Sequence, residues 1–174
     1  MINKETLLKI MPNADHNGRL TALYLYLIEG MTRYGINTIK RQNHFIAQLA
    51  HESGEFRYMQ ELASGSAYEG RTDLGNVEIG DGVTFKGRGL IQLTGRANYA
   101  AISKALGIDF VSNPELLETP KYATLSACWF WNSRGLNALA DADNFLAITK
   151  KINGSTNGLT QREMYLDRAE KYNI

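Results

Sequence analysis

Two glutamates in residues 44–61, HFIAQLAHESGEFRYMQE, have the types and spacing that acid–base catalysis needs. Four apolar residues of this stretch fall on one arc of a helix: Phe45, Ile46, Leu49 and Ala50. Glu52 projects from the edge of that arc, where partial desolvation favours a protonated carboxyl. Gly54 is expected to end the helix, and Glu61 follows in polar surroundings that keep it ionised. One protonated and one ionised carboxyl group form the pair that glycoside hydrolysis uses.

The spacing of these glutamates alone leaves a second interpretation open. The chain has 18 acidic residues, and two glutamates nine positions apart in a helix-to-loop segment are often solvated surface residues. The position of Glu52 beside apolar packing favours a function, because an unpaired acid near a core normally needs a reason. Glu52 and Glu61 are therefore candidate catalytic residues.

The composition excludes several other classes of protein. With 174 residues, 44% of them hydrophobic, the chain suits one domain with a sizeable core. A net charge of +1 gives no overall attraction to nucleic acid or to an anionic membrane. The one cysteine, Cys128, excludes an internal disulfide, and His16, His44 and His51 lack the spacing of metal ligands. We expect no metal, no cofactor and no nucleic-acid partner.

The N-terminal segment, MINKETLLKIMPNADHNG, is too polar for a secretory signal. No run of residues approaches the roughly 20 apolar positions that a membrane-spanning helix needs. We therefore expect a soluble chain that is made in the cytosol and needs another agent to reach a target outside it.

The apolar spacing predicts a mainly helical chain in two lobes that flank a groove, with a small irregular β element. Helices are expected at residues 6–11, 20–34, 44–53, 94–106, 112–117, 120–132, 142–151 and 161–172. Residues 36–42 are expected to be a linker, with Asn43 as a candidate cap of the next helix. Residues 64–89 contain seven glycines, which predicts an irregular segment lining the cleft. The aromatic cluster WFW at 129–131 is expected in the core, although one ring could face the cleft and suit a sugar.

Residues 86–99, KGRGLIQLTGRANY, are the second stretch that could do chemistry. LIQL is expected to be a short buried strand. Gln92 and Thr94 alternate with Ile91 and Leu93, so the polar pair shares one face, where it could bind a sugar or position a water. A capping threonine and an exposed glutamine are an equally good interpretation. Neither GxGxxG nor a Walker motif is present, so nucleotide binding is not expected.

Three motifs, AHESGEF, KGRGLIQLTGRANY and INGSTNGL, together resemble those of glycoside hydrolase family 19. Plant chitinases founded this family, and phage and bacterial peptidoglycan-degrading proteins belong to it. The resemblance covers roughly residues 41–172, and the short loop between the first two motifs looks more like a phage endolysin than a plant enzyme. It implies a lysozyme-like α+β fold that is mainly α, in a single catalytic domain of residues 1–174 without a separate wall-binding domain.

The resemblance also implies roles for individual residues. Glu52 matches the general acid of the family and Glu61 its general base, with Glu69 and Glu55 as rivals for the base. Thr94 matches the residue that helps to hold the attacking water. Three residues match positions that contact substrate: Gln92, Asn98 and Asn153. Arg168, in YLDRAEKY, resembles the arginine that organises the acidic site.

The activity implied is that of an endolysin-type glycosidase, which cuts β-1,4 bonds between N-acetylated sugars of bacterial peptidoglycan with inversion. A chitinase, a lytic transglycosylase and a non-catalytic wall-binding module are the alternatives. The partners expected are peptidoglycan strands and, for release, a membrane-permeabilising holin-like protein. The chain is expected to be a monomer, made in the host bacterial cytoplasm and acting on the wall in the periplasm.

Overall fold

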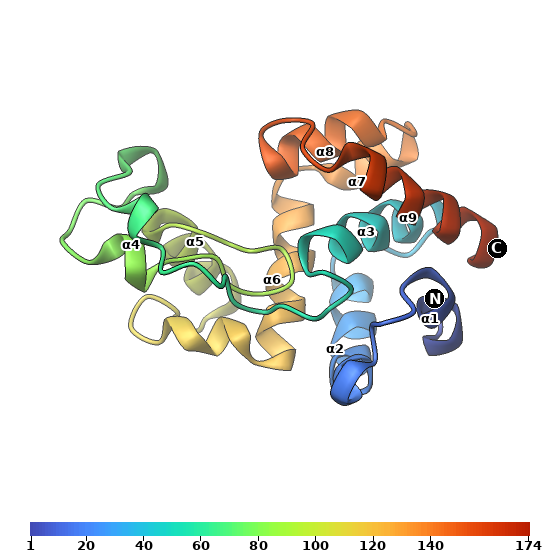
Figure 1. The fold of residues 1–174 in the computed structure, drawn as a ribbon, viewed down its shortest axis with the longest axis horizontal. Helices are drawn as coiled ribbons and strands as arrows, with labels where there is room; N and C mark the ends of the chain where they lie inside the picture. Colours follow the sequence, from blue (N-terminus) through green and yellow to red (C-terminus); the bar gives the residue numbers. More distant parts are fainter.

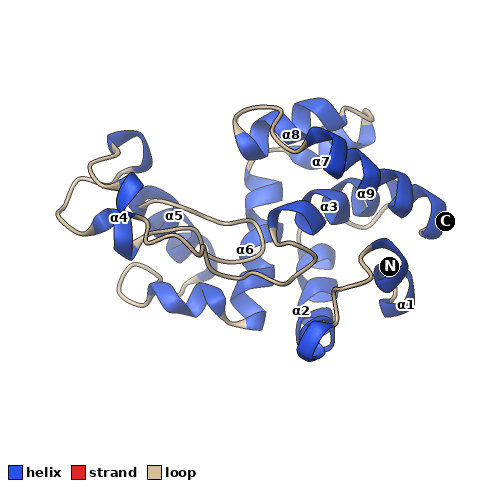
Figure 2. Cartoon of the chain, in the orientation of Figure 1, coloured by secondary structure: helices blue, strands red, loops and turns tan.

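The structure, a computed structural model, describes all 174 residues, and its regular elements are helices (Figure 2). The α-helices are α1 (Lys4–Ile10), α2 (Arg19–Arg33), α3 (Ile39–Glu52), α4 (Asp81–Thr84), α5 (Arg96–Leu106), α6 (Pro120–Ser133), α7 (Leu136–Asp141), α8 (Phe145–Asn153) and α9 (Leu159–Tyr172). The short 3₁₀ helices are η1 (His16–Gly18), η2 (Ser66–Tyr68), η3 (Thr72–Leu74) and η4 (Pro114–Glu118). None of the helices is both long and apolar enough to cross a bilayer.

The helices form two lobes (Figure 1). One lobe holds both chain ends and contains α3 packed along α9, with α1, α2, α7 and α8 around this pair. The other contains α4 and α5 with the glycine-rich loops, and α6 passes between the two lobes and packs against α2. The expected mainly α, lysozyme-like architecture is confirmed.

Helix α3 carries Glu52 at its last position and is longer than predicted. It begins at Ile39, because the side chain of Thr38 accepts a hydrogen bond from the Arg41 amide at 3.2 Å and so caps the helix. The predicted linker at 36–42 is therefore half helical. Asn43 is not a cap but a buried residue inside the helix, whose Oδ1 accepts from Asn173 Nδ2 at 2.7 Å.

The end of α3 and the aromatic cluster follow the sequence prediction more closely. Ser53 Oγ donates to the Leu49 carbonyl at 2.6 Å and accepts from the Phe56 amide at 2.8 Å, which closes the helix. On the apolar side, Phe45 packs edge-on against Trp131 with ring centroids 5.2 Å apart. Trp131 is buried in the core as predicted.

The LIQL segment is a tight turn rather than a strand. The amides of Arg88 and Leu93 each donate to the carbonyl of the other, at 3.1 and 2.8 Å, so the chain reverses over four intervening residues. Gln92 has a left-handed backbone (φ +55°), which a strand does not allow. The predicted strand was wrong, and the only ladder contacts are isolated bridges of Arg88 to Gln60 and to Leu93. The bridge of Arg88 to Gln60 joins this turn to the connection that leaves α3.

The predicted helix at 142–151 is instead α8, separated from α7 by a break. Asp143 has a left-handed backbone (φ +58°), and the Asn144 side chain accepts from the Ala147 amide at 3.1 Å to start α8. The predicted helix therefore exists but begins three residues later than expected, and α7 was not predicted. The break between them contains no glycine or proline to mark it.

Candidate active site

Glu52 and Glu61 line one hollow of about 300 Å³ between the lobes. Their side chains come from the end of α3 and from the connection that leaves it, as the spacing of the two residues suggested. The other residues that line this hollow are Tyr58, Gln60, Leu62, Ala63 and Gln92. The Glu52 side chain is 17% exposed, so it lies at the edge of the core and faces the hollow.

Glu52 is held by an arginine that sequence reasoning missed. Arg162 on α9 is buried, and its Nη2 donates to Glu52 Oε1 at 2.5 Å. Its Nη1 donates to Gln48 Oε1 at 2.6 Å, and its Nε donates to the Asn157 carbonyl at 3.3 Å. Gln48 in turn donates to Thr149 Oγ1 at 2.8 Å. The carboxyl group expected to be unpaired is therefore oriented by a network that joins α3, α8 and α9, while its Oε2 has no hydrogen-bond partner in the protein.

Arg168 does not lie in the position expected for it beside the acidic site. Its guanidinium Nη1 donates to the Ile10 carbonyl at 3.2 Å and lies over the Tyr165 ring. It tethers α9 to α1 and has no contact with Glu52. Arg162 could have been identified from its spacing, because it lies three and seven residues before Tyr165 and Ala169, on the buried face of α9.

Glu61 receives a hydrogen bond on each carboxylate oxygen. Tyr68 Oη donates to Oε1 at 3.0 Å, and the Gly87 amide donates to Oε2 at 3.1 Å. Burial, and then the hydrogen bond to Glu61, raises the pKa of Tyr68, so its hydroxyl remains a donor. A side chain at Gly87 would meet Gln92 Oε1 at 2.9 Å and Glu61 Oε2 at 3.2 Å, which explains a glycine at this position. A carboxylate keeps further lone pairs, so Glu61 can also accept from a water.

The two rival glutamates are engaged elsewhere. Glu69 accepts from the amides of Gly80 and Gly82 at 2.7 and 2.8 Å, at the start of α4. Glu55 is buried, and its oxygens accept from Tyr165 Oη at 2.8 Å and the Asn13 amide at 2.7 Å. Neither residue lines the hollow of Glu52 and Glu61.

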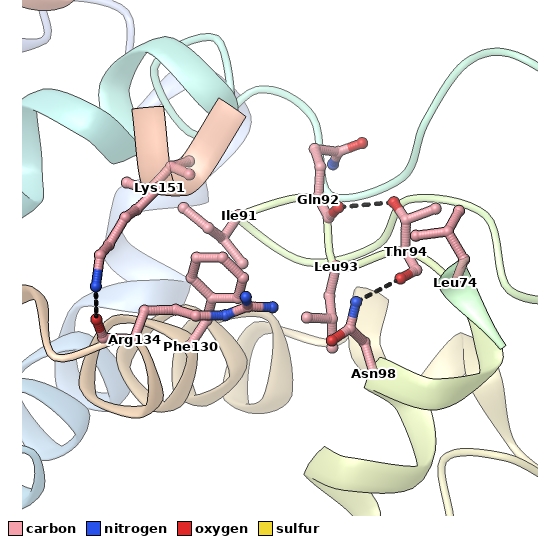
Figure 3. A pocket seen from close by; sticks show the side chains of 10 residues that line it. Leu74, Ile91, Gln92, Leu93, Thr94, Asn98, Phe130, Arg134 and Lys151 are labelled. Atoms are coloured by element: carbon pink, nitrogen blue, oxygen red, sulfur yellow. Dashed lines mark hydrogen bonds between the residues drawn. The ribbon is translucent and has the colours of Figure 1, made fainter. Parts of the chain in front are cut away.

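A second hollow of about 210 Å³ shares Gln92 with the first (Figure 3). Thr94 and Asn98 line this second hollow and not the first. Thr94 Oγ1 donates to the Gln92 carbonyl at 2.9 Å, and Asn98 Nδ2 donates to the Thr94 carbonyl at 2.8 Å. Phe130 is the ring of the WFW cluster that faces this hollow. Gln92 is therefore the one member of the predicted polar set that lies beside both glutamates.

Asn153 lies at the end of α8, next to Ile152, which lines the second hollow. Its Nδ2 donates to the Asn157 carbonyl at 3.1 Å and to Ser155 Oγ at 3.2 Å. The structure thus places Asn153 within the INGSTNGL turn, and its amide shapes that turn. It does not line either hollow.

His51 precedes Glu52 and stands beside the arginine network. Its Nδ1 lies 2.6 Å from Gln161 Oε1. Burial lowers the pKa of His51, and the charge of Arg162 lowers it further. Gly158 packs directly on the imidazole, where a Cβ would overlap the ring.

Comparison with known proteins identifies a family model that matches residues 40–156, that of glycoside hydrolase family 19, described as Chitinase class I. A Haemophilus influenzae protein described as a glycosyl hydrolase family 19 domain-containing protein is 28% identical, over 93% of this chain and 92% of its own length. An Arabidopsis thaliana endochitinase is 39% identical, over 63% of this chain and 37% of the plant protein. The chain thus spans much less than half of that plant relative.

Solved structures have the same fold at low sequence identity. Chitinase C from Streptomyces griseus superposes with a TM-score of 0.76 at 24% identity, over 98% of this chain and 74% of its own. A bacterial family 19 chitinase superposes with a TM-score of 0.79 at 21% identity, over 99% of this chain and 95% of its own. At these identities the likeness establishes the fold.

Proposed function

Since the chain belongs to glycoside hydrolase family 19 and is a glycoside hydrolase, we propose that it cuts β-1,4 bonds between N-acetylated sugars with Glu52 as general acid and Glu61 as general base. The observation that carries this proposal is the hollow that both glutamates line. Each has a different support, an arginine at Glu52 and two neutral donors at Glu61. The two carboxyl groups thus lie in different environments, as a site with an acid and a base requires. An arginine by itself favours the ionised form of a carboxyl group, so the acid role of Glu52 comes from its match to the general acid of the family.

The proposed mechanism is a single displacement. Glu52 gives a proton from its free Oε2 to the glycosidic oxygen, while Glu61 takes a proton from a water that attacks the anomeric carbon from the opposite face. The water oxygen replaces the leaving sugar, so the anomeric configuration inverts. Inverting enzymes keep their carboxyl groups about 6.5–9.5 Å apart to leave room for that water. Arg162 positions Glu52, and Gln92 lies where it can contact the sugar next to the bond.

The remaining predicted residues would act further along the glycan. Thr94 and Asn98 line the second hollow beside Gln92, where a hydroxyl and an amide can bind N-acetyl and hydroxyl groups. We propose that Thr94 contributes to water placement through the Gln92 carbonyl, to which it donates. Asn153 would act by holding the adjoining turn.

Peptidoglycan is the substrate we propose, in an endolysin role. The support is the short connection between Glu52 and Glu61, which resembles that of phage members of the family, and a bacterial relative matched along nearly its whole length. We propose that the chain acts on the wall in the periplasm after a holin-like protein opens the inner membrane. Chitin is the second candidate, because several relatives are named as chitinases.

The test is mass spectrometry of the fragments released from purified sacculi and from chitin oligomers. A muramidase or glucosaminidase releases fragments with a reducing sugar that identifies the bond, whereas a lytic transglycosylase releases anhydro-sugars. Glu52→Gln should lower the rate by roughly 10²–10⁴-fold, the usual effect of general acid–base catalysis, with folding and wall binding intact. Products from chitin alone would replace peptidoglycan as the substrate, and unchanged turnover by Glu52→Gln would refute the mechanism.

The endolysin role has its own test. Purified protein should clear Gram-negative cells whose outer membrane has been permeabilised and leave intact cells unaffected. Equal lysis of intact cells would contradict the need for a permeabilising partner. NMR of fresh products tests the stereochemistry, since retention of the anomeric configuration would exclude the inverting mechanism.

A further inference from the structure

We propose that Arg134 and Lys151 form an anion-binding subsite that recognises carboxylates carried by the substrate glycan. Both residues line the second hollow (Figure 3). This hollow shares Gln92 with the catalytic hollow, the one that Glu52 and Glu61 line. No aspartate or glutamate lines it. The catalytic hollow has the opposite character, with Glu52 and Glu61 in its wall. A glycan lying along both hollows would therefore meet two cations on one side of the catalytic pair.

The charge of Arg134 is not neutralised within the protein. Its guanidinium makes no ion pair and lies over the Phe130 ring, 4.9 Å from the centroid. By contrast, Arg88 holds Glu118 at 2.7 Å and Arg96 holds Asp81 at 2.6 Å. Stacking on an aromatic ring fixes the guanidinium plane and leaves its N–H groups free for a carboxylate.

Lys151 makes one hydrogen bond within the protein. Its Nζ donates to the Arg134 carbonyl at 3.1 Å, at the C-terminal end of α6. This contact accounts for one of the three donors of an ammonium group and for none of the donors of Arg134. It also ties Lys151 to the end of α6 that carries Arg134, so both cations line the same hollow.

The chemistry of the occupant follows from the charge. Chitin carries no charged groups and would leave both cations unused. Peptidoglycan carries carboxylates on its peptide stems. A muramic acid whose stem has been removed also carries one on its lactyl ether, which is otherwise the amide that joins the stem. A guanidinium binds a carboxylate through two parallel hydrogen bonds. The inference rests on the proposed function, because it takes the catalytic hollow to bind a glycan, and it names the feature of that glycan that the enzyme selects.

The experiment compares three glycans, which are native sacculi, sacculi whose carboxylates are converted to neutral amides, and peptide-stripped strands that keep the lactyl carboxylate. The variant is Arg134→Gln with Lys151→Gln. The matched control is Lys104→Gln with Lys150→Gln, which removes the same charge from exposed residues that line neither hollow. Rates are measured at low and at saturating substrate, and at low and high salt.

Wild-type protein and the control should cleave native sacculi about fivefold faster than amidated sacculi at low substrate, the sum expected from two ion pairs made by exposed residues. The difference should shrink at saturation and at high salt, and the Arg134/Lys151 variant should lose it. A preference for native over amidated sacculi assigns the stem carboxylates, because the lactyl carboxyl of a stem-bearing muramic acid is an amide. If stripped strands are also cleaved faster than amidated sacculi, and only by proteins that keep Arg134 and Lys151, the subsite binds the lactyl carboxylate as well. Equal cleavage of native and amidated sacculi by the wild type, or a preference retained by the variant, would overturn the subsite. Failure of the wild type to cleave any sacculi would instead refute the proposed function and the subsite with it.

Discussion

Arg162 Nη2 donates to Glu52 Oε1 at 2.5 Å, although 110 positions separate the two residues in the sequence. The same guanidinium holds Gln48, one turn earlier on α3, at 2.6 Å. A planar guanidinium fork can bind two partners at once in a fixed geometry. Helix α9 therefore sets the direction of the Glu52 side chain at the end of α3, and the hollow that Glu52 and Glu61 line depends on the packing of α9 against α3.

The first prediction concerns this fork. Arg162→Lys should lower kcat by about tenfold and the free energy of unfolding by about 1–3 kcal/mol, because lysine keeps the charge but cannot hold Glu52 and Gln48 together, which leaves a buried group unsatisfied. The measurements are urea unfolding and steady-state cleavage of sacculi. Arg168→Lys is the control on the same helix and should change kcat little, since Arg168 binds the Ile10 carbonyl. A larger loss of kcat from Arg168→Lys would return the positioning role to Arg168.

The sequence predicted that Glu52 and Glu61 line one hollow, but it did not predict that Arg162 holds Glu52. Glu52 and Glu61 lie close in the chain, so a helix with a defined end was enough to bring them towards one hollow. The contact between α3 and α9 is not local, so the motif around Glu52 does not identify its partner on α9. The buried face of α9, marked by Tyr165 and Ala169, was the available signal.

The backbone departures from the prediction have a different cause. Gln92 and Asp143 both have left-handed backbones, at φ +55° and +58°. Residue types other than glycine seldom adopt this conformation, so alternation placed the first residue in a strand and periodicity placed the second inside the helix expected at 142–151. In each case contacts in the folded protein stabilise a turn that the local pattern of apolar and polar residues does not predict.

The second prediction separates the candidate bases. Glu61→Gln should lower kcat by roughly 10²–10⁴-fold, because a neutral amide cannot take a proton from water. Glu69→Gln should keep activity within a few-fold and lower the unfolding free energy by about 1 kcal/mol, since it weakens the hydrogen bonds from Gly80 and Gly82. Both effects are read from cleavage rates and urea unfolding of the same preparations.

Glu55→Gln completes that comparison. Glu55 is buried between Tyr165 and the Asn13 amide, so its substitution should reduce stability while the protein that remains folded keeps its kcat. Loss of turnover in folded Glu55→Gln or Glu69→Gln, with Glu61→Gln active, would move the base away from Glu61.

The third prediction concerns the pH dependence of stability. His44 is buried, with Nε2 2.9 Å from Asp143 Oδ1 and Nδ1 without a partner. Burial lowers the pKa of His44 from 6.5, and Asp143 only partly opposes it. Folding therefore favours the neutral ring, so its contribution to stability is complete above pH 6.5 and is lost as the pH falls below that value. The unfolding free energy of the wild type should fall between about pH 6.5 and pH 5, before carboxylates titrate.

His44→Gln tests the assignment, because an amide does not titrate and can still donate to Asp143. Its unfolding free energy should change less steeply with pH than that of the wild type. A smaller slope should persist, since burial also lowers the pKa of His51. An identical slope in the variant would show that His44 does not control this dependence.

The fourth prediction compares two glycines in the turn after α8. Gly154 and Gly158 both have left-handed backbones, at φ +74° and +72°, so alanine at either position should cost about 1 kcal/mol from the backbone alone. The two positions differ in the room they leave for a side chain. A Cβ at Gly154 meets nothing within 4 Å, whereas one at Gly158 overlaps the His51 ring. Gly158→Ala should therefore lose about 1–3 kcal/mol more and also lower kcat, because the ring it displaces adjoins Glu52. Thermal unfolding and sacculus cleavage measure both effects, and equal losses in the two variants would show that His51 does not transmit packing to the acid.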